Sequence, residues 1–288
     1  MITGPTQRTA GVDLVAGATR RTRGVDVVAG STRRAPGVDL VAGPTGRAAG
    51  VDLIAAAHGT ADPRGIREVR ELIRMMARRR PDVPVSLGFV DVDVPALPGL
   101  VARVVADSNQ AVVVPLLLSG GYHVYVDVAA EADRYPGRVR TAPALGPSPV
   151  LAEILADRLG NLGCVDHVVL AAAGSSDPRA LADCSETADL LSARVDRPVS
   201  VGYVSGAGER LASVLSRTPG EVAVATYLLA PGFFADRVRR LAAGRPVTPP
   251  LGADPRLADL ALRRYEAVGY RGTGSGGRFG LAGCVATA

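Results

Sequence analysis

Residues 51–64 read VDLIAAAHGTADPR, and residues 168–179 return to the same pattern as VVLAAAGSSDPR. In both copies a run of apolar residues leads into a short polar stretch that ends in Asp-Pro-Arg. The apolar run is typical of a strand that is covered on both faces. Asp followed by Pro is typical of the first turn of a helix, where the carboxylate caps free backbone N–H groups. The stretch therefore predicts a strand–loop–helix unit that is used twice.

Three further segments return in the same order. VSLGFV at 85–90 returns as VSVGYV at 199–204, LLLSGG at 116–121 as YLLAPG at 227–232, and LGPSP at 145–149 as LGADP at 251–255. The offset between the copies falls from 115 residues (177 − 62) to 106 (251 − 145), as expected when the second copy has shorter loops. We infer a duplication with halves at 51–163 and 164–270.

Within the first half, apolar runs alternate with segments of helical periodicity, which is the signature of a parallel α/β sheet. We predict strands at 51–57, 83–90, 111–118 and 138–142, and a surface helix after the first strand that is capped by Thr60 or Asp62. The predicted fold class is α/β, with two duplicated subdomains. Each is an open parallel sheet of about four strands with flanking helices.

The two ends of the chain differ from these halves. A Gly-Val-Asp motif begins at residues 11, 24, 37 and 50, at intervals of 13 residues, and the segments between the copies show no helical pattern. We interpret 1–50 as a repetitive, disordered extension and 271–288 as a Gly-rich flexible tail. The GTGSGG stretch at 272–277 fits G-x-G-x-x-G by letter, but no strand precedes it and no helix follows it.

Composition limits the classes of function. Hydrophobic residues make up 47% and charged residues 21%, which is ordinary for a globular protein, and no apolar run reaches the roughly 18–20 residues of a membrane span. Without a membrane span or a secretory signal, the cytoplasm is the expected compartment. The net charge is +5, but the arginines are dispersed and aromatic residues are only 4%, so we expect neither a nucleic-acid nor a membrane partner. The oligomeric state stays open.

Three reactive side chains follow predicted strands. His58 comes directly after the first strand, Asp91 directly after the second, and His123 five residues after the third. The carboxyl ends of parallel strands form the edge at which such sheets bind ligands. A single histidine at a strand end is usually structural, whereas three such residues at one edge indicate a metal-handling or acid–base site.

The duplication separates function from folding. The second copy has Ala173 in the place of His58, Ser205 in the place of Asp91 and Phe234 in the place of His123. All three reactive groups are lost together while the apolar framework persists. We therefore predict one active site in 51–163 and a structural half at 164–270, with Phe234 at least partly buried. The third histidine, His167, precedes a strand at the opposite edge and is not assigned to the site.

The residue types indicate the chemistry. Imidazole together with a carboxylate suits Fe²⁺, Co²⁺, Ni²⁺ or Zn²⁺ better than Mg²⁺ or Ca²⁺, and neutral histidine accepts protons near pH 7. The three cysteines have no C-x-x-C spacing, which argues against a cysteine zinc site. A phosphate-binding loop of the G-x-x-x-x-G-K-[ST] type is excluded because the sequence contains no lysine, and no G-x-S-x-G hydrolase motif follows a strand.

Four segments together resemble the sirohydrochlorin chelatase family, the long two-half form of the class II tetrapyrrole chelatases. They are AAAHGTADPRG (55–65), SLGFVDVDVP (86–95), VVVPLLLSGGYHVYVDV (112–128) and APALGPSPVLAEIL (142–155), and the resemblance covers about 51–270. It implies a lyase that inserts Fe²⁺ or Co²⁺ into sirohydrochlorin for siroheme or cobalamin synthesis, with the metal as substrate and no permanently bound cofactor.

The resemblance also implies roles for individual residues. His58 and His123 match the family's metal-site histidines, and we assign both to metal binding and proton acceptance. Asp91 stands where the family usually has Glu, so its role as a third polar group is open. Sirohydrochlorin carries carboxylates, and the helix start at Thr60 and Arg64 offers a binding rim for them. Two alternatives are kept: a metal or tetrapyrrole carrier without turnover, and a regulatory paralogue with a vestigial site.

Overall fold

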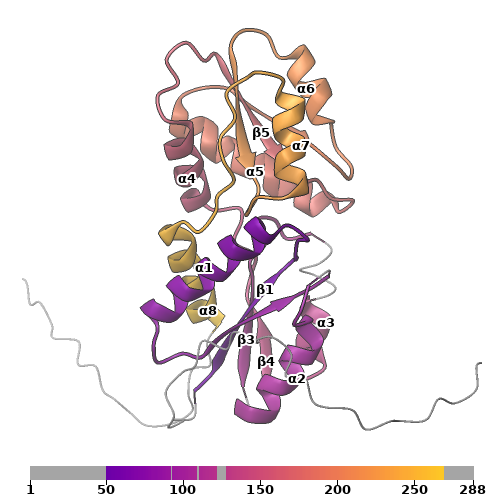
Figure 1. Cartoon of the computed structure of the whole chain (residues 1–288), viewed down its shortest axis with the longest axis vertical. Coiled ribbons are helices and arrows are strands. Elements are labelled where there is room, and N and C mark those ends of the chain that lie inside the picture. The colour runs from indigo at the N-terminus through magenta and orange to yellow at the C-terminus, as the bar shows by residue number, and fades with distance from the viewer. Residues whose placement is uncertain (1–49, 92, 109, 122–127, 269–288) are drawn as a thin grey trace, which may run out of the picture. The chain divides into compact units, whose positions relative to one another are not determined.

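The computed structural model describes residues 50–91, 93–108, 110–121 and 128–268 (Figure 1). The predicted extension lies outside the described residues except for Gly50. The predicted tail at 271–288 and His123 also lie outside them.

The first sheet has four parallel strands in the order β2-β1-β3-β4. They are β1 (Asp52–Ala57), β2 (Val85–Phe89), β3 (Ala111–Pro115) and β4 (Val139–Thr141). Every residue of β1 is buried, because helices cover both faces of the sheet at this central strand. The four predicted strands are confirmed, each within three residues at its ends.

Helices of the first sequence half are α1 (Pro63–Arg79), α2 (Leu97–Ser108), α3 (Ala129–Asp133) and α4 (Pro149–Leu159). The start of α1 is the one predicted, since the Asp62 carboxylate accepts a hydrogen bond of 2.8 Å from the Arg64 amide and Pro63 is the first helical residue. Its buried stripe includes Val69, Leu72 and Met76. The opposite face of the sheet packs against α2 and α3.

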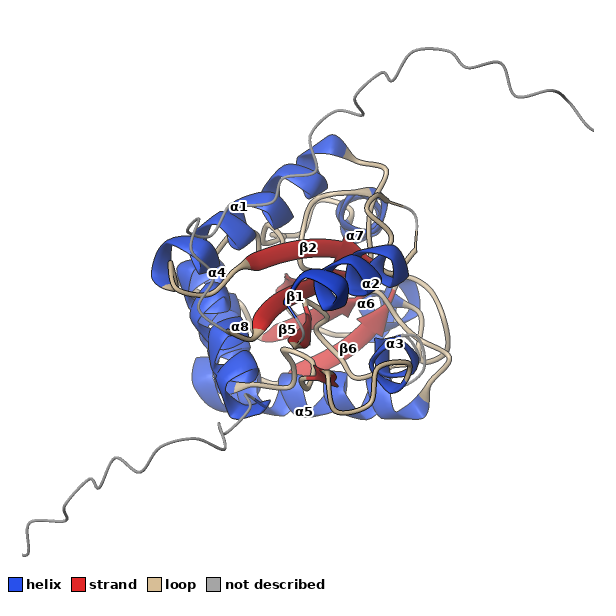
Figure 2. Ribbon diagram, turned by 90° about the horizontal axis from the view of Figure 1, so that it is seen from below, coloured by secondary structure: helices blue, strands red, loops and turns tan. Residues whose placement is uncertain are grey.

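The second sheet has three parallel strands in the order β6-β5-β7. They are β5 (His167–Ala172), β6 (Val199–Tyr203) and β7 (Val222–Tyr227), and the helices are α5 (Pro178–Val195), α6 (Leu211–Arg217), α7 (Phe233–Ala242) and α8 (Pro255–Val268). At the position where β4 pairs with β3 in the first sheet, the second sheet has a single parallel bridge between Val224 and Val247. Helices lie around the strands (Figure 2). Among the described residues, no helix is both long and apolar enough to cross a bilayer. The predicted α/β class with two parallel sheets is confirmed.

The last helix of each sequence half packs on the other half. Helix α4 contacts α5 and β7, whereas α8 contacts α1 and β3 (Figure 1). One buried cluster accordingly contains side chains of both halves, such as Leu53 and Met76 with Leu170 and Leu191. Removing either sequence half would expose the apolar surface that its exchanged helix covers. The halves at 51–163 and 164–270 are thus sequence repeats with one sheet each, and each contributes its last helix to the other half.

His167 begins β5 at the amino end of the strand, and its Nε2 lies 2.9 Å from the Ser200 hydroxyl of β6. Burial lowers its pKa below the usual value near 6.5, and the charge of Arg217 lowers it further. The unfolded chain therefore binds the proton more tightly than the folded one. The contribution of neutral His167 to the free energy of unfolding is therefore complete above pH 6.5, and it is lost as the pH falls through the pKa of the folded state.

We expect the thermal midpoint of the wild type to drop between pH 7.5 and pH 5.5 by more than that of His167→Gln, which has no proton to gain. Melts of both proteins across this range check the prediction. Parallel curves for the two proteins would contradict it.

Candidate functional site

The carboxyl ends of both sheets line a single cavity of about 700 Å³. In the first sheet the lining includes Ala57 and Phe89 at the ends of β1 and β2, and Leu116 directly after β3. In the second sheet it includes the last residues of the three strands, Ala172, Tyr203 and Tyr227. This volume falls within the range of pockets that enclose small organic ligands. The position agrees with the rule that open parallel sheets bind ligands beyond the carboxyl ends of their strands.

His58 and Asp91 both line this cavity, and both are exposed. Each follows its strand closely, and the Asp91 amide donates a hydrogen bond of 3.3 Å to the His58 carbonyl oxygen. The structure therefore brings together two of the three predicted catalytic residues. An imidazole and a carboxylate that line the same cavity are groups of the kind that bind a divalent cation or accept a proton.

Thr60 also lines the cavity, and its amide donates a hydrogen bond of 2.7 Å to the Asp93 carboxylate. Sequence reasoning did not single out Asp93. The sequence signal that could have identified it is the Asp-x-Asp spacing of Asp91 and Asp93 after β2. Through this hydrogen bond, Asp93 connects the loop after β2 to the loop after β1.

The segment that precedes His123 in the chain is held by the second half. The Gly120 amide donates a hydrogen bond of 2.6 Å to the Asp183 carboxylate of α5. The Tyr227 hydroxyl donates one of 2.6 Å to the Leu118 carbonyl oxygen. Burial raises the pKa of Tyr227 above its usual value, so the phenol keeps its proton and stays a donor at neutral pH. These crossing contacts were not predicted.

The second half presents a different wall at the equivalent positions. Ala173 follows β5 as His58 follows β1, and the Val204 amide bonds to Ala172 as the Val90 amide bonds to Ala57. This shared geometry supports the matching of His58 with Ala173 and of Asp91 with Ser205. Phe234 is 36% exposed and is one of the exposed large apolar side chains of the described residues, so it is less buried than a purely structural role would require.

Metal-ligating groups are few in the described part of the cavity. Within that part, no group of three His, Cys, Asp or Glu side chains is placed to hold a metal ion, and the imidazole and carboxylate side chains of the lining are those of His58 and Asp91. Cys184 lines the cavity as well, but burial raises the pKa of its thiol to about 12, with the charge of Asp183 adding to the effect. The thiol is thus protonated at neutral pH and a poor metal ligand.

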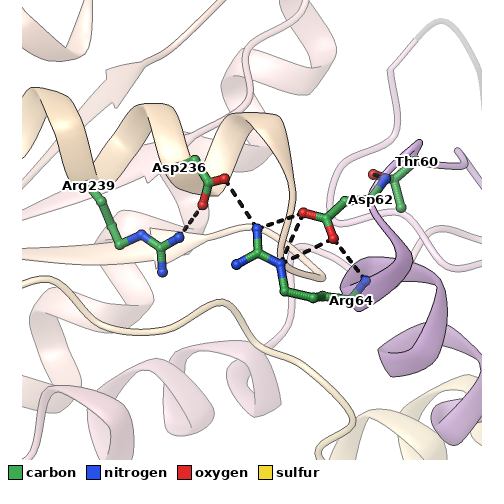
Figure 3. A network of polar contacts seen from close by, with 5 residues as sticks. All are labelled: Thr60, Asp62, Arg64, Asp236 and Arg239. Carbon is green, nitrogen blue, oxygen red and sulfur yellow. Dashed lines mark hydrogen bonds and ion pairs between the residues drawn. The ribbon is translucent and has the colours of Figure 1, made fainter.

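Arg64 does not belong to the described cavity lining. Its guanidinium donates to the Asp62 carboxylate at 2.6 Å and to the Asp236 carboxylate of α7 at 3.2 Å, and Asp236 also pairs with Arg239 (Figure 3). Hydrogen bonds from Arg64 hold the pKa of Asp62 near 2. Arg64 therefore links the start of α1 to α7 across the two halves.

Part of this arrangement is repeated and therefore structural. In the second half the Asp177 carboxylate accepts from the Arg179 amide at 2.9 Å and from its guanidinium at 2.7 Å, and the Ser175 hydroxyl takes the place of the Thr60 hydroxyl. An Asp-Pro-Arg cap thus begins a helix in both copies. In the first copy Arg64 also contacts Asp236 of α7 at 3.2 Å.

Comparison with known proteins agrees with the duplication. The CbiX family profile matches residues 52–162 and 167–268, once in each half. The curated sirohydrochlorin ferrochelatase of Priestia megaterium is 29% identical over 174 residues, which cover 55% of this chain and 65% of that relative. The chain thus spans slightly less than two thirds of that relative's length.

Two solved structures have similar folds. SirB from Bacillus subtilis with Fe³⁺ matches with a TM-score of 0.64 at 22% identity. The sirohydrochlorin chelatase SirB from Bacillus subtilis subspecies spizizenii, in complex with cobalt, matches with a TM-score of 0.62 at 21% identity. Both matches cover 75% of this chain and 94% of the other chain. At these identities the likeness establishes the fold.

Proposed function

Because the chain belongs to the CbiX family, we propose that it inserts a divalent metal, Fe²⁺ or Co²⁺, into sirohydrochlorin, for siroheme or cobalamin synthesis. The observation that carries the proposal is the placement of His58 and Asp91 in a cavity whose second-half wall has Ala173 and Ser205 instead. The name of the relative from Priestia megaterium and the Fe³⁺ and cobalt complexes of SirB support the substrate class.

The reaction exchanges one metal ion for two protons. The metal bonds to the macrocycle nitrogens while two pyrrole N–H protons leave. We assign metal delivery and proton acceptance to His58 and His123, because neutral imidazole performs both tasks near pH 7. Asp91 orients the metal or the neighbouring imidazole. The metal ion enters as substrate and leaves in the product.

Metal insertion is tested by mixing sirohydrochlorin with Co²⁺ or Fe²⁺ under anaerobic conditions and following the absorbance of the macrocycle with and without protein. We expect the protein to raise the rate well above the spontaneous one, with many turnovers per chain. Saturable binding without product would instead indicate a carrier. Absence of binding to both the metal and sirohydrochlorin would indicate a vestigial site.

Thr60 and Arg64 are the proposed substrate contacts. Thr60 lines the cavity, whereas Arg64 would have to exchange Asp236 for a substrate carboxylate. Such an exchange costs little, because exposed ion pairs are screened by solvent and contribute little to stability.

We expect Arg64→Ala to raise the KM for sirohydrochlorin by roughly two- to fivefold and to leave kcat unchanged. Steady-state rates at varied sirohydrochlorin concentration measure both constants. Arg179→Ala, at the equivalent position of the second half, is the matched control and should leave KM unchanged. An unchanged KM for Arg64→Ala would show that Arg64 does not bind the substrate and only pairs with Asp62 and Asp236.

A further inference from the structure

Two adjacent phenylalanines at the start of α7 are exposed at the cavity. Within the described residues, the large apolar side chains that stand out as exposed are Val94 at 82%, Phe233 at 65% and Phe234 at 36%. Both phenylalanines belong to the cavity lining, whereas Val94 does not. Their ring centroids are 5.6 Å apart and the ring planes are inclined by 68°.

The packing of α7 does not account for these aromatic side chains. The helix buries Ala235, Val238 and Ala242, which share one face at helical spacing. The phenylalanines precede this stripe. Exposed apolar area on a folded protein is unfavourable in water, and adjacent aromatics at a concave surface are a common mark of ligand binding. Aromatic residues are also scarce here, with four phenylalanines and no tryptophan in 288 residues.

The rest of the second-half wall limits the kind of ligand it binds. Its described lining residues include small, hydroxyl-bearing and apolar side chains but no His, Asp or Glu. Apart from the protonated Cys184 thiol, the described part of this wall offers no imidazole or carboxylate to a metal ion or a proton. It does offer apolar area with two aromatic rings, which suits a conjugated ring system.

We propose that Phe233 and Phe234 form the stacking surface for one face of the tetrapyrrole macrocycle, so that the second half holds the macrocycle while the first half delivers the metal. This assignment rests on the proposed function and adds the residues that recognise the substrate. Because the two rings are steeply inclined to each other, one presents its face and the other its edge to the same flat ligand. Both are favourable aromatic geometries. Phe234 occupies the position that matches His123, so an aromatic contact replaces a metal ligand in the second copy.

The test is an anaerobic titration of metal-free sirohydrochlorin into metal-free protein, followed by the absorbance of the macrocycle. We expect Phe233→Ala and Phe234→Ala each to weaken binding by about tenfold or more, in line with the cost of removing one stacking aromatic. Phe233→Tyr keeps the flat ring and should bind within about twofold of the wild type. Phe233→Leu keeps apolar bulk without a flat face and should bind as weakly as Phe233→Ala.

Val94→Ala is the matched control, since it removes a more exposed apolar side chain outside the cavity, and it should bind like the wild type. Co²⁺ binding without tetrapyrrole should be the same in all variants. Unchanged sirohydrochlorin affinity in both alanine variants, or full affinity in Phe233→Leu, would overturn the stacking role and leave the chelatase proposal intact. Parallel loss of Co²⁺ binding would overturn it too, since the pair would then act on the metal site. A wild type that does not bind sirohydrochlorin would overturn both proposals.

Discussion

Replacing His58 with alanine is expected to lower the rate of metal insertion by at least about 100-fold, the usual contribution of a positioned acid–base group. The imidazole follows β1 directly and is exposed at the cavity wall, so its removal should change the free energy of unfolding by no more than about 1 kcal/mol. His123→Ala should have a similar effect on activity. The double variant should be little worse than either single one, because each change already disables the shared site.

The matched control is His167→Ala, which removes the same side chain from the opposite edge of the second sheet. Its activity per folded molecule should equal that of the wild type. Insertion rates and thermal melts on the same preparations separate the two effects. If His58→Ala melted early and kept normal activity per folded molecule, the histidine would be structural and the assigned site wrong.

Replacing Tyr227 with alanine is expected to destabilise the protein by roughly 3–5 kcal/mol, the usual cost of removing a buried aromatic side chain. Tyr227 is 2% exposed, and its hydroxyl bonds to Leu118 of the other half and lies 3.2 Å from the Thr187 hydroxyl. For a protein of this size the melting midpoint should fall by roughly 6–20 °C.

Two further variants divide that loss. Tyr227→Phe keeps the ring and removes the crossing hydrogen bond, so we expect a loss of about 1–3 kcal/mol from the unpaired carbonyl oxygen. Phe234→Ala removes an aromatic that is 36% exposed and should cost clearly less than Tyr227→Ala. Denaturant unfolding of the three variants gives the comparison. Equal stability of Tyr227→Ala and the wild type would show that the two halves do not depend on this contact.

Much of the fold was predictable because it is encoded locally. The apolar runs predicted the strands of the first half with bounds that differ from the observed ones by at most three residues. The Asp-Pro pair predicted the start of α1 at Pro63. The rule for parallel sheets placed His58 and Asp91 at one edge, where they line the same cavity. These features depend on neighbouring residues or on the direction of the chain.

The contacts between the halves could not be predicted in this way. Helices α4 and α8 each pack on elements of the other half, which are far away in the sequence. The apolar pattern of a helix predicts that one face is buried, but it does not indicate which sheet that face covers. The hydrogen bonds from the Gly120 amide to Asp183 and from the Tyr227 hydroxyl to Leu118 span 63 and 109 residues. Arg64 was predicted from its place at a helix start, but its engagement with Asp236 depends on a residue 172 positions away.

A single metal site in the first half implies that only one ion binds per chain, although both halves share one fold. Calorimetric titration of Co²⁺ into the metal-free protein measures this number. We expect one ion bound per chain, with binding weakened at least about tenfold in His58→Ala and unchanged in His167→Ala. Two ions per chain, or one ion bound with full affinity by His58→Ala, would contradict a single site in the first half.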